Sequence, residues 1–235
     1  LTTGIKDPRI RKVLEEFVKA GADPEILYKH KPHIGTDRLR EIVKNLRMKI
    51  ESMGGEVRFR TRLESIETAE GQIRAVVTSG GRIETDYLVL AIGHSARDTF
   101  GMLHDAGIHM EQKPFSIGVR IEHSQKDINR AQYGDEKLAG ILGAADYKIS
   151  YRCPETGRGV YTFCMCPGGV VVNASTEPGT SVTNGMSYSG RNSEYANSAL
   201  LVDVRREDFD GDHPLAGMKF QEKYEKLAWE NRTAG

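Results

Sequence analysis

A run of six apolar residues at positions 87–92, followed directly by a glycine, constrains the fold more than any other feature of this sequence. Six residues are far fewer than the roughly 20 that a membrane-spanning helix needs. A strand that lacks polar positions is usually covered on both faces. We therefore expect residues 87–92 to form a strand inside a sheet that is flanked by other layers.

The segment after this strand predicts a helix whose N-terminus could contact an anion. Gly93 is followed by His94 and Ser95, and Ser95 with Asp98 three residues later has the form of a capping box. A strand that enters a helix through a glycine presents unpaired N–H groups and the positive end of the helix dipole. This junction is therefore the strongest site signal from the residues alone. A strand–turn–helix junction without a ligand is the alternative.

Two helices and a series of short strands are predicted before this junction. Asp7 suits the cap of a first helix that closes at Gly21, and Thr36 is expected to cap a second helix that ends at Gly54. Residues 56–92 contain alternating apolar positions and hairpin-type turns, which predict a run of strands.

The chain from about position 115 onward is expected to be mostly antiparallel. Alternation over 116–121 predicts a strand with Ile117, Val119 and Ile121 facing inward. Other expected elements are strands at 147–151, 160–164, 170–173 and 200–204 and a last helix from about residue 215.

Residues 174–199 are rich in Ser, Asn, Gly and Thr and show little periodicity. We expect this stretch to form a long ordered loop, and such loops are often functional. The predicted fold class is α+β (mixed α/β), with residues 1–112 in one part and residues 113–235 in the other.

The charge balance excludes some partners. Lys and Arg total 33, Asp and Glu total 33, and the formal net charge is zero. Binders of nucleic acid or of anionic membranes usually carry a basic excess, so we expect neither partner. The chain does not open with a basic segment followed by an apolar one, and we therefore expect it to be cytoplasmic.

The cysteines and histidines give little support to a metal or redox centre. Cys153, Cys164 and Cys166 are too few for a disulfide framework, and Cys-x-Cys is not the spacing of a zinc knuckle. A redox role for Cys164 and Cys166 is the weaker alternative. His30 and His33 could share a metal ion, but no third ligand lies near them in the sequence, so we predict no metal site.

Four motifs carry a resemblance to a known family, and together they cover nearly the whole chain. They are Pro-His-Ile-Gly-Thr-Asp at 32–37, Leu-Ala-Ile-Gly-His-Ser-Ala-Arg-Asp at 90–98, Tyr-Thr-Phe-Cys-Met-Cys-Pro-Gly-Gly at 161–169, and Asn-Gly-Met-Ser at 184–187 with Asn-Ser-Ala-Leu at 197–200. With them, the chain resembles the uncharacterised FAD-dependent dehydrogenases of bacteria, in the superfamily of two-dinucleotide-binding flavoproteins.

The resemblance implies a flavoprotein fold. Residues 1–112 would be part of an FAD/NAD(P)-binding-type domain, with a β-meander and with strand 87–92 returning to its sheet. Residues 113–235 would be an inserted, mostly antiparallel substrate-side domain that ends in a helix. FAD would be the cofactor, with NAD(P)H as a candidate electron donor.

The chain lacks the Gly-x-Gly-x-x-Gly motif that holds the FAD pyrophosphate in such proteins. It also begins with Leu and ends with Gly. We therefore expect an internal fragment of a longer protein, which on its own binds no FAD and is inactive.

The resemblance also implies a set of site residues. His33 is a candidate for handling a proton beside the flavin, because histidine titrates near neutral pH. A structural histidine that is hydrogen-bonded in its loop is the alternative. The residues implied to contact the cofactor are Gly35, Thr36, Ala91, Gly93, His94 and Ser95. The residues implied to line the substrate pocket are Cys166, Gly168, Gly169, Asn184 and Ser187.

The function implied is that of an FAD-dependent oxidoreductase, a dehydrogenase that acts on an unknown small organic molecule. Its partners would be this substrate and the remainder of its own parent chain. The alternative is a non-catalytic ligand-binding or assembly module. A strand that ends in Gly-x-Gly-x-x-Gly upstream of this chain would favour the flavoprotein, and its absence would favour the module.

Overall fold

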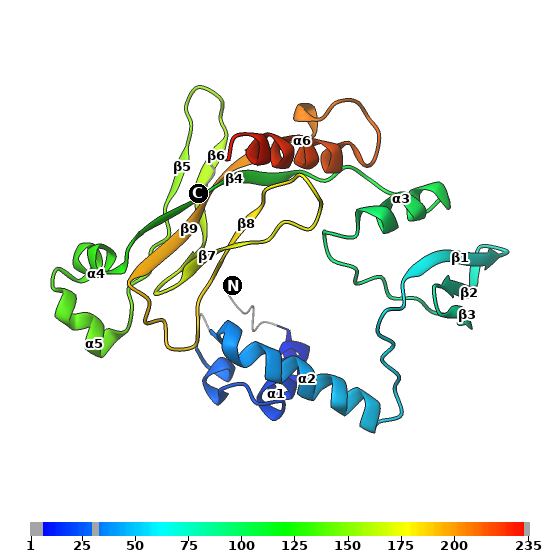
Figure 1. Cartoon of the computed structure of the whole chain (residues 1–235), viewed down its shortest axis with the longest axis horizontal. Coiled ribbons are helices and arrows are strands. Elements are labelled where there is room, and N and C mark those ends of the chain that lie inside the picture. The colour runs from blue at the N-terminus through cyan, green and yellow to red at the C-terminus, as the bar shows by residue number, and fades with distance from the viewer. Residues whose placement is uncertain (1–6, 30–32, 233–235) are drawn as a thin grey trace. The chain divides into compact units, whose positions relative to one another are not determined.

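The structure is a computed structural model that describes residues 7–29 and 33–232. Helices and antiparallel sheets are both present, which confirms the α+β prediction (Figure 1). The chain divides into two compact units. The first comprises Leu1–Val57, Ser116–Ser175 and Ser181–Asp203, and the second comprises Arg58–Phe115, Thr176–Thr180 and Val204–Gly235.

The first unit begins with a small helical core. Helix α1 (Pro8–Lys19) starts as expected, because the Asp7 carboxylate accepts a hydrogen bond of 2.9 Å from the Arg9 backbone N–H. A 3₁₀ turn (Pro24–Leu27) and helix α2 (Thr36–Ser52) follow. The buried apolar side chains shared by these elements are Ala20, Ala22, Ile26 and Ile42.

A four-stranded sheet forms the larger part of the first unit. Its strands, in spatial order, are β4 (Phe115–Ser124), β9 (Tyr195–Val204), β6 (Gly159–Cys166) and β5 (Ser150–Arg152). Strands β6 and β9 pair antiparallel, with an irregularity between Phe163 and Cys166. Helices α4 (Gln125–Tyr133) and α5 (Ala139–Leu142), with a 3₁₀ turn (Glu136–Leu138) between them, follow β4, and the sequence analysis did not predict them.

The polar stretch 174–199 is more regular than expected. Strand β7 (Val170–Asn173) pairs antiparallel with strand β8 (Thr183–Met186), and β9 begins at Tyr195. The prediction of one long loop was therefore wrong, because polar residues form strands when a neighbouring strand satisfies their backbone groups.

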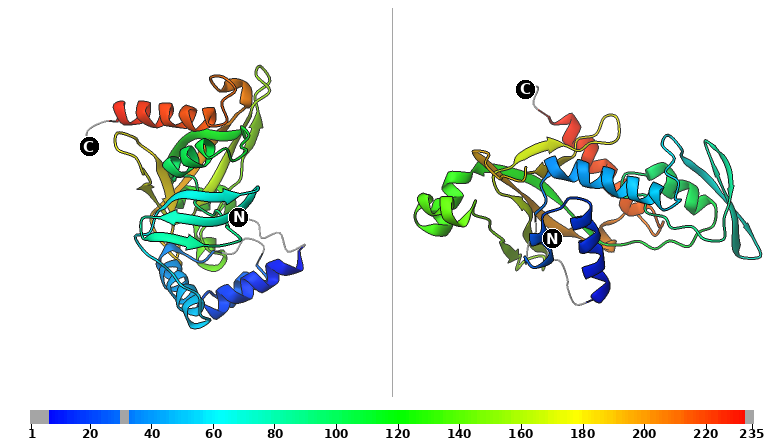
Figure 2. Two further views of the ribbon diagram at one scale, coloured as in Figure 1. Left: turned by 90° about the vertical axis from the view of Figure 1, so that its right-hand side faces the viewer. Right: turned by 90° about the horizontal axis from the view of Figure 1, so that it is seen from below.

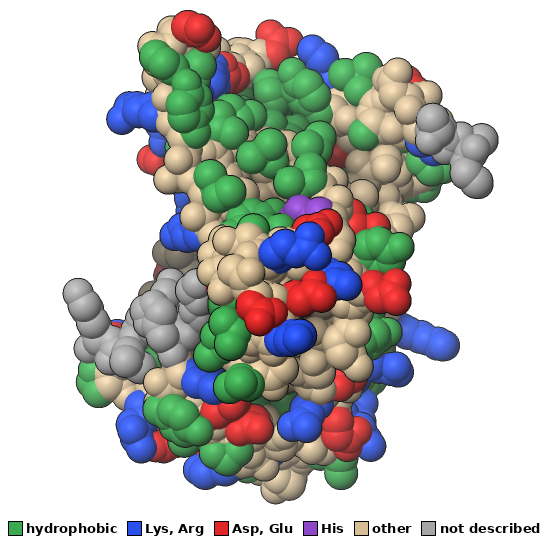
Figure 3. Space-filling view, turned by 90° about the vertical axis from the view of Figure 1, so that its left-hand side faces the viewer, with side chains coloured by type: hydrophobic (Ala, Val, Ile, Leu, Met, Phe, Trp, Pro, Cys, Tyr) green, Lys and Arg blue, Asp and Glu red, His purple; other side chains and the backbone are tan. Residues whose placement is uncertain are grey.

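Two of the three apolar residues of β4 that were expected to face inward are exposed. Val119 keeps 63% of its surface accessible and Ile121 keeps 39%, so the prediction that they face inward was wrong. Among residues 7–29 and 33–232, no layer buries these two side chains. Figure 3 shows apolar side chains gathered on one face of the molecule. Arg120, between the two, projects from the opposite face of the strand.

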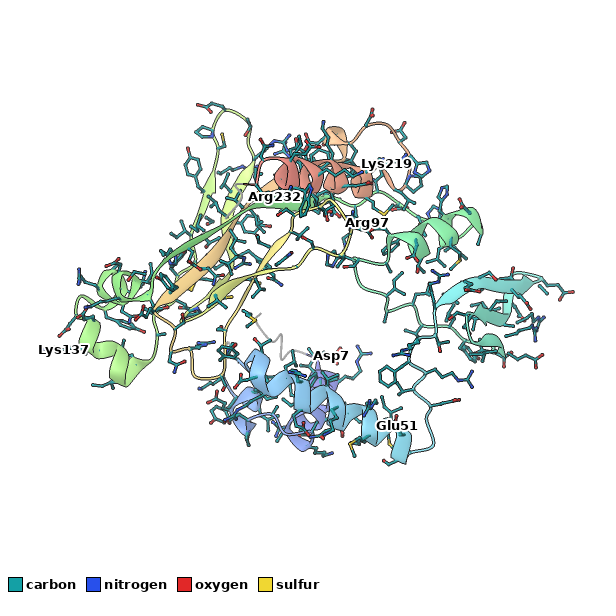
Figure 4. The ribbon with its side chains drawn as sticks, viewed as in Figure 1. Asp7, Glu51, Arg97, Lys137, Lys219 and Arg232 are labelled. Carbon is teal, nitrogen blue, oxygen red and sulfur yellow. The ribbon has the colours of Figure 1, made fainter. Side chains whose placement is uncertain are left out.

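The second unit contains the predicted β-meander. Strands β1 (Leu63–Ala69), β2 (Gln72–Thr78) and β3 (Gly81–Glu84) pair antiparallel in that order, and they lie side by side in Figure 2. Helix α3 (Arg97–Asp105), a 3₁₀ turn (Arg206–Asp208) and helix α6 (Ala216–Glu230) complete the unit. Arg97, labelled in Figure 4, forms an ion pair with Glu225 of α6 at 2.7 Å.

The apolar segment 87–92 does not form a strand in the described chain. Tyr87 is 90% exposed and Val89 is 88% exposed, so the expectation of a doubly covered strand was wrong. A strand needs a neighbour for its backbone hydrogen bonds, and the described residues provide none for this segment. The capping-box prediction was also wrong: α3 begins after Ala96 without a side-chain cap, and the Ser95 hydroxyl lies 3.4 Å from Nε2 of His94 instead.

Candidate functional site

The N-terminus of α2 is closed by a segment that lies about 150 residues later in the chain. Thr36 donates to the backbone carbonyl of Ser187 from its N–H at 3.2 Å and from its hydroxyl at 3.0 Å. Thr36 is thus the first helical residue. The prediction that it caps the helix was wrong. The capping position belongs to Gly35, whose φ of +88° suits glycine. A Cβ at position 35 would collide with the backbone of Ser189.

Asp37 strengthens the same junction. Its carboxylate accepts hydrogen bonds from the backbone N–H of Ser189 at 2.8 Å and from the Ser189 hydroxyl at 2.7 Å. The hydroxyl bond, followed by the backbone bond, lowers the pKa of Asp37 below its ordinary value. Asp37 therefore presents a stable negative charge in the first turn of α2, where the helix dipole favours it.

His33 lies beside this junction. Its Nε2 is 3.1 Å from the backbone carbonyl of Tyr188. A carbonyl oxygen only accepts, so Nε2 is the donor and the neutral ring keeps its lone pair at Nδ1. Burial is the largest influence on the ring, and the pKa of His33 is lowered. The lowered pKa keeps the imidazole neutral, with the Nδ1 lone pair as its acceptor site. His30, its expected companion in a metal site, lies outside the described residues.

The glycine pair at 168–169 packs against the segment that closes α2. The N–H of Gly168 donates to the buried Oε1 of Gln125 at 2.7 Å, and a Cβ at position 168 would collide with the carbonyl of Arg191. A Cβ at Gly169 would collide with the carbonyl of Met186. Both glycines therefore permit close backbone approach, as expected, and the neighbouring atoms are those of the chain itself.

A polar cluster, which we define as Arg120, Cys166, Asn184 and Asn197, lies where β4, β6, β8 and β9 meet. Nη1 of Arg120 donates to Oδ1 of Asn197 at 2.7 Å, and Nη2 lies 3.5 Å from Oδ1 of Asn184. Gly185 makes this approach possible, because a Cβ there would collide with both the Arg120 guanidinium and the Asn197 amide.

Cys166 belongs to this cluster as a protonated thiol. Its Sγ lies 3.3 Å from the backbone carbonyl of Cys164, and burial raises the pKa of the thiol above its ordinary value. A raised pKa disfavours the thiolate, which is the reactive form. The geometry thus gives Cys166 a packing and hydrogen-bonding role and weakens the redox alternative.

The structure brings together many of the residues expected at the site. His33, Gly35, Thr36 and Ser187 form one junction, and Cys166, Gly168, Gly169 and Asn184 lie in the same unit. The other expected cofactor contacts, at 91 and 93–95, belong to the second unit. Gly93 there has a φ of +70° and open space where a Cβ would be.

Sequence reasoning missed two residues of the polar cluster. Asn197 is fully buried and Arg120 is half-buried in the middle of a strand. Asn197 opens one of the motifs that carried the resemblance, so a signal was present. Arg120 lies between two apolar residues of β4, and the sequence analysis gave it no role.

No group of three or more His, Cys, Asp or Glu side chains among residues 7–29 and 33–232 could hold a metal ion. None of the helices described is long and apolar enough to cross a membrane.

The fold is that of an α+β chain, and its first unit contains both a partly buried polar cluster and a closed helix N-terminus. The family described as FAD-dependent protein, C-terminal domain-like, matches residues 114–234, just over half of the chain, and the chain belongs to this family. The resemblance is thereby confirmed at the level of an FAD-dependent protein family.

The chain is also similar to an uncharacterized protein of Clostridium beijerinckii. The two are 52% identical over 229 residues, which is 97% of this chain and 43% of the relative. The chain thus spans less than half of the length of that protein.

Proposed function

We propose that this chain is the substrate-side part of an FAD-dependent oxidoreductase. The observation that carries the proposal is the junction of His33 with the start of α2 and with residues 187–189. It holds a neutral imidazole in the same unit as the polar cluster, in a chain of an FAD-dependent family.

The residues of the two units differ in how well they fit the cofactor. The space that Gly35 leaves is occupied by Ser189, and the N–H of Thr36 is already bonded, so the start of α2 does not suit the FAD phosphates. Gly93 is open, and the start of α3 has no side-chain cap. The N–H groups of Arg97 and Thr99 at the start of α3 are already bonded, so it is the open space at Gly93 that favours Ala91, Gly93, His94 and Ser95 for the approach of a dinucleotide.

The chemistry divides between cofactor and chain. Bound FAD would supply hydride transfer. The chain would orient the substrate beside the polar cluster, and His33 would take a proton from it at Nδ1 as hydride leaves, or return one in the reverse direction. NAD(P)H is the candidate electron donor to the flavin.

The relative from Clostridium beijerinckii offers the sharpest test. We expect that protein to purify with flavin absorbance in the visible range, or to gain it on incubation with FAD followed by dialysis. We expect the 235-residue chain alone to remain colourless under the same treatment. A relative that holds no flavin after reconstitution would overturn the proposal and favour a non-catalytic ligand-binding or assembly module.

A further inference from the structure

Two guanidinium groups near Cys166 have no carboxylate beside them in the described part of the chain. The partners of Arg120 are neutral oxygens: Oδ1 of Asn197, Oδ1 of Asn184 and the carbonyl of Cys164 at 3.3 Å. The positive charges of Arg120 and Arg191 both act on the Cys166 thiol. Several arginines elsewhere in the described chain pair with acids, as Arg97 does with Glu225 and Arg82 with Glu67.

Several donors in this region also have no acceptor. Among the described residues, Nε of Arg120, Nε of Arg191 and Nδ2 of Asn197 are buried and form no hydrogen bond. Buried donors are normally satisfied, and charged ones especially so. The polar cluster and Arg191 therefore have a surplus of N–H groups and of positive charge.

Arg120 is held in place before any ligand binds. Its Nη1 is fixed by Asn197, which is fully buried, while Nη2 makes a long contact of 3.5 Å with Asn184. The side chain of Asn184 is on the exposed side of the cluster. Nη2 and the Asn184 amide can thus meet a ligand together, with little loss of side-chain freedom.

The surroundings favour a single negative charge. The three oxygens around the Arg120 guanidinium already offset part of its charge. A phosphate dianion is usually held by several N–H donors, including those of an open helix start, and the start of α2 is closed here by Ser187 and Ser189. A carboxylate carries one charge and matches the planar fork of a guanidinium.

We propose that Arg120, with Asn184 beside it and Arg191 nearby, binds a carboxylate group of the substrate. That the bound molecule is a substrate rests on the proposed function, whereas the anion site itself requires no flavin. The substrate class would then be small organic acids.

The test uses the 235-residue chain without flavin and three probes: sodium acetate, sodium propionate and sodium phosphate. Each is titrated at constant ionic strength, set with sodium chloride, while the Nε–H signals of the arginines are followed by NMR. We expect acetate and propionate to shift the Arg120 signal saturably and phosphate to bind at least 10-fold more weakly. In Arg120→Gln, we expect saturable carboxylate binding to be lost.

The controls separate this site from general surface charge. Arg152→Gln removes an exposed arginine from β5 of the same sheet and should leave the carboxylate affinity unchanged. Asn184→Ala changes an exposed side chain and should weaken acetate binding several-fold. This variant tests the site if Arg120→Gln does not fold. The proposal is overturned by non-saturable shifts, by phosphate binding as tightly as acetate, or by Arg152→Gln and Asn184→Ala having equal effects. Since no flavin is present, these outcomes are independent of whether the relative from Clostridium beijerinckii binds flavin.

Discussion

Asp37 and Ser189, 152 positions apart in the sequence, are joined by two hydrogen bonds that use both carboxylate oxygens of Asp37. The pair fixes the segment after β8 to the first turn of α2, and thereby places Tyr188 where its carbonyl meets His33. The position of His33 in the candidate site depends on this contact.

The contact should make stability depend on pH. The folded chain lowers the pKa of Asp37, so its contribution is complete above the unfolded pKa, near 4, and is lost as the pH falls through the folded value. We expect Asp37→Asn to melt at a lower temperature than the wild type at pH 7, with the gap shrinking below about pH 4. Thermal melts between pH 3 and pH 7 measure this. Asp210→Asn, at an exposed turn, is the control, and a gap that does not change with pH would contradict the prediction.

Gly35→Ala should destabilise the chain far more than the same change at the other end of α2. Gly35 and Gly54 both have positive φ values, +88° and +86°, so alanine is strained by about 1–3 kcal/mol at each position. At position 35 the new Cβ also collides with Ser189, while position 54 has open space. Overpacking adds about 1–3 kcal/mol at position 35 only. Urea unfolding followed by circular dichroism compares the two, and equal losses would mean that Ser189 does not pack on α2.

Local patterns in the sequence were sufficient for the elements that depend on near neighbours. The first turn of α1 follows from Asp7 and Pro8, and the meander follows from alternation and from the turn at Glu70 and Gly71, whose φ values are both positive. These signals are contained within a few residues, so the structures that they predict do not depend on contacts with the rest of the chain.

Signals that depend on distant partners were misread. A strand at 87–92 requires a neighbour that the described chain does not supply. The contacts of β4 with β8 and β9 decide which of its side chains are buried. Arg120 became part of the candidate site only because Gly185 and Asn197 lie against it. No sequence window around Arg120 contains those contacts.

The ion pair between α3 and α6 gives a prediction for the second unit. Nη2 of Arg97 donates to both carboxylate oxygens of Glu225, at 2.7 and 2.8 Å, and the two side chains are only 13% and 18% exposed. A double-mutant cycle with Arg97→Ala and Glu225→Ala should give a coupling energy of about 1.5–3 kcal/mol, typical of hydrogen bonds between charged groups. The exposed i,i+4 pair Lys226–Glu222 should give only about 0.3–0.5 kcal/mol. Comparable values for the two cycles would contradict the prediction.

Gly93→Val tests the proposed cofactor contact in the FAD-loaded full-length protein. Gly93 and Gly107 flank α3 with φ values of +70° and +75°, and both have open space where a Cβ would be. Valine should therefore cost each a similar strain, about 1–3 kcal/mol. If the dinucleotide passes close to position 93, only Gly93→Val also places a branched side chain against it. We expect that variant to lose flavin at least 10-fold faster during dialysis than Gly107→Val, at equal thermal stability. Equal retention of flavin by the two variants would mean that the turn at Gly93 faces away from the cofactor.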